Sequence, residues 1–176
     1  VSVTSFRAKM RMFLGPLEDS KPWDTKGITG VSKFLKKLWS LFYNDEGLIV
    51  NSDQPTKEQL KILHLCIKKV RGDIEKFSMN TCISAFMVAV NDLKKTSCQS
   101  QSLLTDLIKL MAPFAPFITE QLWHDLGHEG SIHQLAKYPI HNEDLLVENQ
   151  ISYPICINGK KRTTATFSLD QSKDEI

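Results

Sequence analysis

The sequence lacks the marks of membrane proteins and of disulfide-rich secreted proteins. No apolar run is long enough to cross a bilayer, and no signal peptide opens the chain. The four cysteines, Cys66, Cys82, Cys98 and Cys156, form no CxxC pair, which argues against a zinc site of that type. We interpret them as reduced, small apolar residues of a cytoplasmic protein.

The sequence also lacks an assembled catalytic or metal site. There is no glycine-rich phosphate loop, neither GxGxxG nor a Walker sequence. His124 and His128 have the i, i+4 spacing of a helical metal pair, but Gly127 lies between them and is expected to end the helix. No third ligand is nearby, and Cys98 forms no credible nucleophile–base pair with any histidine. We therefore expect no catalytic residue, metal or cofactor in this chain.

What the sequence does contain is enough apolar residues for a core and a helical pattern. Of its 176 residues 41% are hydrophobic and 24% charged, which is typical of a folded domain. The spacing of apolar residues predicts a mainly α fold, an up-and-down bundle of five helices. These helices are expected near 3–14, 28–43, 56–77, 80–93 and 100–126.

Local signals predict where several helices begin and end. Thr56 and Gln59 fit a capping box at the start of the third helix, and its apolar seam runs on to Phe77. Ser78 or Asn80 is expected to cap the fourth helix. In the fifth helix, Pro113 and Pro116 each remove a backbone donor, so we expect a kink there.

The character of the sequence changes near Tyr138, where a linker begins. The runs ISYPICI and KKRTTATF flank Asn158-Gly159, which is a strong signal for a β-hairpin. We expect this hairpin to open a truncated α/β domain. The chain begins with Val1 and stops at DEI, so we expect a piece of a longer polypeptide, with domains at 1–137 and 138–176.

Lysines and arginines gather locally although the net charge is only +2. Lys33, Lys36 and Lys37 share one side of the second helix, where an anionic partner would relieve their repulsion. The candidate residues for binding such an anion are Lys33, Lys36, Lys37, Lys68, Lys69, Arg71, Lys160, Lys161 and Arg162. A solvated helix face is the alternative interpretation. No cluster of exposed aromatic residues for base stacking is evident.

Several motifs together resemble the bacterial leucyl-tRNA synthetases. They are MFLGPLEDSKPWD at 12–24, GVSKFLKKLWSLF at 30–42, LMAPFAPFITEQLWHDLGHEGSI at 110–132 and ICINGKKR at 155–162. The first string is quite specific to the leucyl enzymes, whereas LxAPFAPxxxExLW is shared with the methionyl, valyl and isoleucyl enzymes. The resemblance covers nearly the whole chain.

The resemblance implies the carboxy-terminal part of such an enzyme, with a helix-bundle anticodon-binding domain and the first strands of a small tRNA-binding domain. The parent would join leucine to its tRNA with ATP and Mg²⁺, but the HIGH and KMSKS motifs are absent here, so this chain should be inactive. Glu18, Ser20, Lys21 and Trp23 would form a loop that docks on the catalytic core. The alternatives are another class I synthetase, valyl or methionyl, and a helical module that binds an acidic protein.

Overall fold

The computed structural model describes residues 25–146, 150–157 and 160–168. The predicted first helix and most of the loop that follows it lie outside these residues. The chain divides into two compact units, of which the first ends at Asn142 and the second begins at Glu143. This division lies a few residues beyond the boundary that the sequence placed at 137/138.

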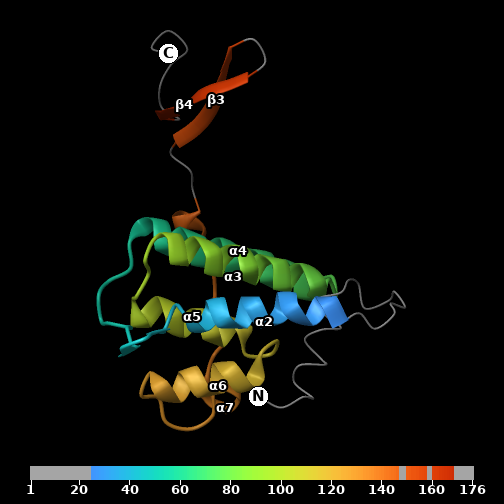
Figure 1. The fold of residues 1–176 in the computed structure, drawn as a ribbon, viewed down its shortest axis with the longest axis vertical. Helices are drawn as coiled ribbons and strands as arrows, with labels where there is room; N and C mark the ends of the chain where they lie inside the picture. Colours follow the sequence, from blue (N-terminus) through green and yellow to red (C-terminus); the bar gives the residue numbers. More distant parts are fainter. Residues whose placement is uncertain (1–24, 147–149, 158–159, 169–176) are drawn as a thin grey trace. The chain divides into compact units, whose positions relative to one another are not determined.

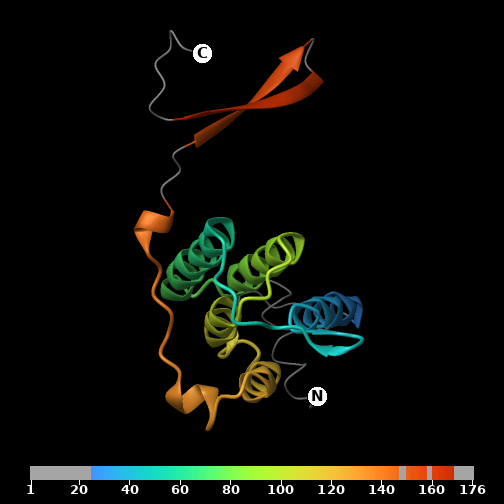
Figure 2. The same ribbon diagram turned by 90° about the vertical axis from the view of Figure 1, so that its left-hand side faces the viewer.

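The first unit is a bundle of α-helices. They are α2 (Thr25–Trp39), α3 (Lys57–Glu75), α4 (Met79–Lys95), α5 (Gln101–Met111), α6 (Pro116–Asp125) and α7 (Ile132–Leu135). In Figures 1 and 2, α3 and α4 lie side by side in one layer above α2 and α5, and α6 lies beneath α5. The mainly α bundle predicted from the sequence is confirmed. A short hairpin after α2, of β1 (Tyr43–Asn44) and β2 (Gly47–Leu48), was not foreseen.

The core lies where α3, α4 and α5 meet. Four side chains there are each at most 2% exposed: Leu63 and Ile67 of α3, Phe86 of α4 and Leu104 of α5. Leu63 and Ile67 are four residues apart, so they share the inward face of α3. The ring of Phe86 meets that of Phe114 edge to face, with centroids 5.1 Å apart. Burying each large side chain stabilises the fold by about 1.5–3 kcal/mol, so this interior holds the helices in place.

The start of α3 has the predicted capping box. The Gln59 N–H donates to Thr56 Oγ1 over 3.2 Å, and the Thr56 N–H donates to Gln59 Oε1 over 3.0 Å. Gln59 Nε2 also donates to the carbonyl of Thr96, which ties the start of α3 to the end of α4. Ser78 precedes α4, but its hydroxyl makes no capping bond. Instead its carbonyl accepts the hydroxyl of Thr81.

One prediction was wrong: Phe77 is not part of the apolar seam of α3, because the helix ends before it. Phe77 has a left-handed backbone with φ 56° and is 73% exposed. The next N–H, of Ser78, donates to Asp73 O over 2.8 Å, which closes α3 with a Schellman-type turn. The same turn closes α6 at Gly127, as predicted, with φ 83°. A glycine in the sequence predicts a helix end of this kind. Phe77 does not, because its position continues the apolar period of the helix.

The two prolines separate two helices and do not kink a single one. Pro113 lies in the turn after α5, and Pro116 is the first residue of α6, where a missing N–H is harmless. Pro113 has no N–H to donate to the carbonyl of Lys109, four residues earlier. That carbonyl instead accepts the N–H of Ala112 over 3.4 Å. The break lets α5 pack on α3 while α6 packs on α7.

The second unit contains the hairpin predicted around Asn158-Gly159. A 3₁₀ turn (Glu143–Leu145) is followed by β3 (Gln150–Ile157) and β4 (Lys160–Ser168), which pair antiparallel. The register shifts between Ile155, opposite Thr163, and Cys156, opposite Lys161, so Arg162 is the extra residue of a bulge.

Candidate nucleic-acid interface

The orientation of α2 is set by its apolar stripe. Val31 and Leu38 are buried at 4% and 0% exposure, and Phe34 packs partly buried against the same core. Because side chains three or four apart share a helix face, burying this stripe turns the opposite side of α2 to solvent.

Lys33, Lys36 and Lys37 lie on that exposed side. Within the described part of the chain none of them forms a salt bridge, since all the ion pairs there join other residues. Lys36 and Lys37 occupy the last turn, where the partial negative charge of the helix end favours cations. The three lysines thus lie on the exposed side of α2, without carboxylate partners among the described residues.

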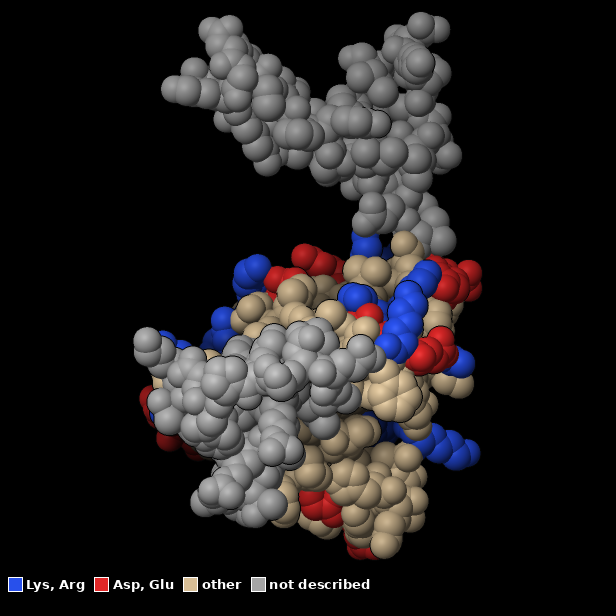
Figure 3. Space-filling model, turned by 90° about the vertical axis from the view of Figure 1, so that its right-hand side faces the viewer, with Lys and Arg blue, Asp and Glu red and all other residues tan. Residues whose placement is uncertain are grey.

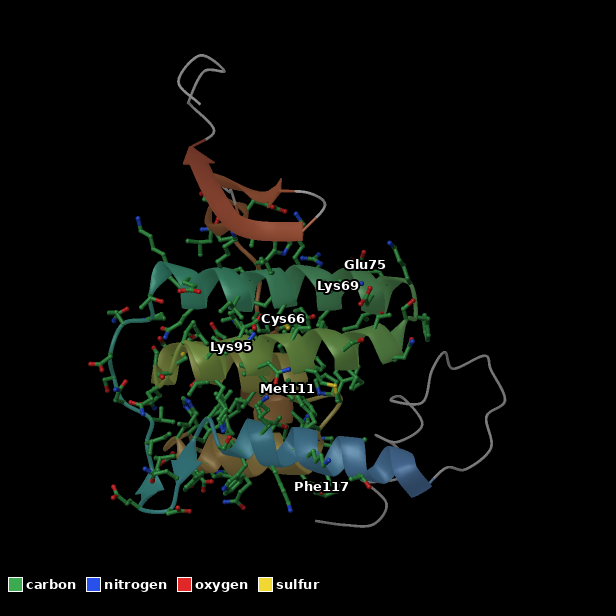
Figure 4. The ribbon with its side chains drawn as sticks, turned by 45° about the horizontal axis from the view of Figure 1, so that its top comes forward. Cys66, Lys69, Glu75, Lys95, Met111 and Phe117 are labelled. Carbon is green, nitrogen blue, oxygen red and sulfur yellow. The ribbon has the colours of Figure 1, made fainter. Side chains whose placement is uncertain are left out.

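The basic residues of α3 are arranged differently. Lys69 Nζ lies 2.7 Å from Asp73 Oδ1, and Arg71 Nε lies 3.5 Å from Glu75 Oε1, both in i, i+4 pairs. Figure 4 labels Lys69 and Glu75 on this helix. Lys68 is exposed on the same helix. Because the protein's own carboxylates already neutralise Lys69 and Arg71, α3 offers less free positive charge than α2.

The structure adds a lysine that the sequence analysis missed. Lys94, at the end of α4, donates from Nζ to Ser40 Oγ over 2.5 Å, and Ser40 Oγ donates to Lys37 O over 2.9 Å. This contact joins the ends of α2 and α4 and places Lys94 beside the α2 lysines. The neighbouring Lys95 is instead paired with Asp92 at 2.7 Å. In the sequence, the only hint of this contact was the pair Lys94-Lys95 near the predicted end of the fourth helix.

On one face of the molecule the visible surface charge is mixed. The face in Figure 3 shows basic and acidic side chains interspersed, without one large field of a single sign. Exposed aromatic residues are scattered as well. Trp39, 37% exposed, stacks on Tyr43 with centroids 4.6 Å apart, while the exposed Phe77 and Phe117 form no ring pair among the described residues. A surface of this kind is suited to binding phosphates and less suited to stacking several bases.

The remaining candidate residues lie where side chains are not described. Lys160 and Lys161 are opposite Ile157 and Cys156 in the β3–β4 ladder, and Arg162 is in the bulge. The loop residues Glu18, Ser20, Lys21 and Trp23 fall outside the described residues, so their docking role stays a prediction.

His124 and His128 lie on either side of the end of α6. The helix has ended at Asp125, and His124 Nδ1 lies 3.2 Å from the carbonyl of His128. The ring of His128 stacks on Trp123, with centroids 3.9 Å apart. No group of three or more metal-ligating side chains occurs among the described residues.

The three cysteines with described side chains are free and buried, as predicted. Burial, followed by the nearby thiol of Cys82, raises the pKa of Cys66 to about 12. Burial also raises the pKa of Cys82 to about 11. Thiols with such pKa values stay protonated near neutral pH and are poor nucleophiles. No helix in the described ranges is long and apolar enough to cross a membrane.

Comparison with known proteins gives consistent results. The family described as the anticodon-binding domain of tRNA ligase matches residues 56–176. The leucine–tRNA ligase of Porphyromonas gingivalis is 53% identical over 165 residues, which cover 94% of this chain and 18% of that protein. The leucine–tRNA ligase of Flavobacterium johnsoniae is 52% identical, with shares of 94% and 17%. The chain thus spans less than a fifth of the length of these relatives.

A solved structure is also similar to this chain. It is the ternary complex of LeuRS (agnB2), tRNA and LeuAMS from Agrobacterium radiobacter K84, with a TM-score of 0.71 and 26% sequence identity. The match covers 97% of this chain and 23% of that one.

Proposed function

Because the chain belongs to the family of anticodon-binding domains of tRNA ligases, we propose that it holds leucine tRNA for the catalytic core of a leucine–tRNA ligase. In this proposal the chain supplies contacts and position, and the bond between leucine and tRNA is formed elsewhere in the parent protein. The names of the relatives and the tRNA in the matching complex support leucine tRNA as the ligand.

The observation that carries the proposal is the exposed group of lysines on α2. Lys33, Lys36 and Lys37 have no carboxylate partner among the described residues, and Lys94 is tied beside them through Ser40. Ammonium groups are point charges suited to phosphate oxygens. Contacts of this kind fix the position of an RNA without reading its sequence, so a tRNA could be held without recognition of its anticodon bases.

The parent enzyme would carry the remaining functions. Leucylation would use ATP and Mg²⁺ bound by the catalytic core in the cytoplasm, and the loop with Glu18, Ser20, Lys21 and Trp23 would dock on that core. The hairpin residues Lys160, Lys161 and Arg162 would add further phosphate contacts from the second unit. Since the sequence contains neither the HIGH nor the KMSKS motif, the isolated chain should not activate leucine.

Two measurements test the proposal against its rivals. Aminoacylation by the full-length parent should occur with leucine and not with valine or methionine; charging with either of these instead would favour another class I synthetase. Filter binding of the chain to leucine tRNA should persist in the presence of an excess of an acidic protein. If that protein removes the tRNA completely, a module for acidic protein partners is the better account.

A further inference from the structure

Trp39, the last residue of α2, is exposed next to residues that are fully buried. Leu38 before it and Phe42 after it are each 0% exposed, whereas Trp39 is 37% exposed and lies outside the core cluster. The N–H of Phe42 donates to the carbonyl of Trp39 over 3.0 Å, so a tight turn fixes the backbone where α2 ends. The helical period and this turn bury the neighbours and leave much of Trp39 accessible to a ligand.

Tyr43 holds the indole of Trp39 in one orientation. The two rings are stacked, with centroids 4.6 Å apart and planes 6° from parallel. Tyr43 begins β1, where it pairs with Leu48, and it packs partly buried against the core. Burial, followed by a hydrogen bond with the Asp125 carboxylate, raises the pKa of Tyr43, so its hydroxyl stays protonated near neutral pH. Because Tyr43 supports one face of the indole, Trp39 should lose little conformational freedom when a ligand binds.

Positive charge lies beside this ring. Lys36 is three residues before Trp39 on α2, and side chains at that spacing have Cβ atoms about 5–6 Å apart. Ser40, the residue after Trp39, accepts a hydrogen bond from Lys94 Nζ, which brings a second ammonium group to this end of α2. Neither lysine forms an ion pair with another described residue. An aromatic face next to cations is the combination that binds a nucleic-acid base together with its phosphate.

We propose that Trp39 stacks on one unpaired base of the bound RNA, with the indole face opposite Tyr43, while Lys36 and Lys94 contact the phosphates beside that base. This inference rests on the proposed function, because it needs an RNA on α2, and it adds one contact to a base. A base inside a duplex has no free face, so the ligand is a nucleotide in a loop, a bulge or a single-stranded end. Stacking accepts any base, so Trp39 distinguishes unpaired from paired RNA without reading a sequence.

Fluorescence of the chain with two short strands tests the stacking itself. One strand is an oligoadenylate, and the other is an abasic strand of the same length and charge. The oligoadenylate should quench tryptophan fluorescence, whereas the abasic strand should not, because it has no base to stack. The sequence contains three tryptophans, so the quenching is assigned through its loss in Trp39→Phe. Quenching that persists in Trp39→Phe arises from another tryptophan and would overturn the assignment.

Binding affinities separate stacking from an effect on the fold. Trp39→Leu should weaken binding of the oligoadenylate about fivefold or more, the lower end of what one stacked base contributes, and Trp39→Phe should recover most of the loss. Binding of the abasic strand should be the same in all three proteins. Phe117→Leu removes another exposed aromatic residue and is the matched control, with unchanged affinity expected. If Trp39→Leu weakens both strands equally, Trp39 supports the fold and stacks on no base.

Leucine tRNA distinguishes failure of this inference from failure of the proposed function. Trp39→Leu should weaken tRNA binding about fivefold or more and leave the slope of log K against log salt unchanged, because it removes no charge. Loss of the α2 lysines should lower that slope instead. If Trp39→Leu binds the tRNA as tightly as the wild type, the stacked base is disproved while the lysine surface stands. If the wild-type chain binds no tRNA at all, both proposals fail.

Discussion

Replacing Lys33, Lys36 and Lys37 together with alanine should weaken binding of tRNA and flatten its dependence on salt. All three side chains are exposed on one side of α2 and have no ion pair within the described residues. Their charge is therefore available to phosphates. The buried stripe of Val31 and Leu38 is untouched, so the fold should survive the change.

The magnitude follows from the release of counterions. Each ammonium group that neutralises a phosphate contributes about 0.7–0.9 to the slope of log K against log salt, so the triple variant should lose about 2–3 from that slope. Between 50 and 200 mM salt, the wild type should then lose about 20- to 40-fold more affinity than the variant does. Filter binding over a salt series measures both quantities.

A matched control removes the same charge elsewhere. Lys57, Lys76 and Lys137 are exposed and are not among the candidate RNA-binding residues. Replacing them with alanine changes the net charge as the α2 variant does, from +2 to −1, because 2 − 3 = −1. If the control flattens the slope as much as the α2 variant, only overall charge matters and the α2 face is not a phosphate-binding surface. An unchanged slope in the α2 variant would refute the reasoning directly.

Three further predictions concern stability and reactivity. Thr56→Ala should lower the free energy of unfolding by about 1 kcal/mol in urea, because the N–H of Gln59 loses its cap, and Thr56→Ser should not. Burial raises the pKa of Asp73, but the hydrogen bond and the positive charge of Lys69 act in the opposite direction, and the pKa lies below 3.8. The free energy of unfolding should therefore fall as the pH drops through that lowered value, and Asp73→Asn should flatten this acid limb in urea titrations at several pH values. Cys66, with a pKa of about 12, should resist a disulfide reagent at pH 8 until guanidinium unfolds the chain, and rapid labelling of native protein would contradict its burial.

Much of the candidate site was evident before the structure because it depends on a single helix. The spacing of Lys33, Lys36 and Lys37 against Val31 and Leu38 is fixed by the helical period, and the structure describes them on opposite sides of α2 as predicted. The state of Lys69 was equally accessible, since Asp73 lies one turn further along the same helix. That pairing was overlooked although the spacing contains it.

The parts that could not be predicted arise between elements distant in the sequence. The bond of Lys94 to Ser40 joins residues 54 positions apart, and the bond of Asn142 to His64 joins residues 78 apart. No local periodicity records either contact. The same holds for the division of the fifth helix, because the sequence shows that Pro113 and Pro116 disturb it but not how far the chain turns.

The sequence by itself determined the helices, the hairpin around Asn158-Gly159, the exposed lysine face and the resemblance to synthetases, because each depends on residues that are neighbours along the chain. The tertiary structure alone decided that Lys94 bonds to Ser40 at the end of α2, where α5 gives way to α6 and that the N–H of Asn142 bonds to His64. These outcomes depend on which distant groups meet when the apolar faces are buried together, and that packing is a property of the whole bundle.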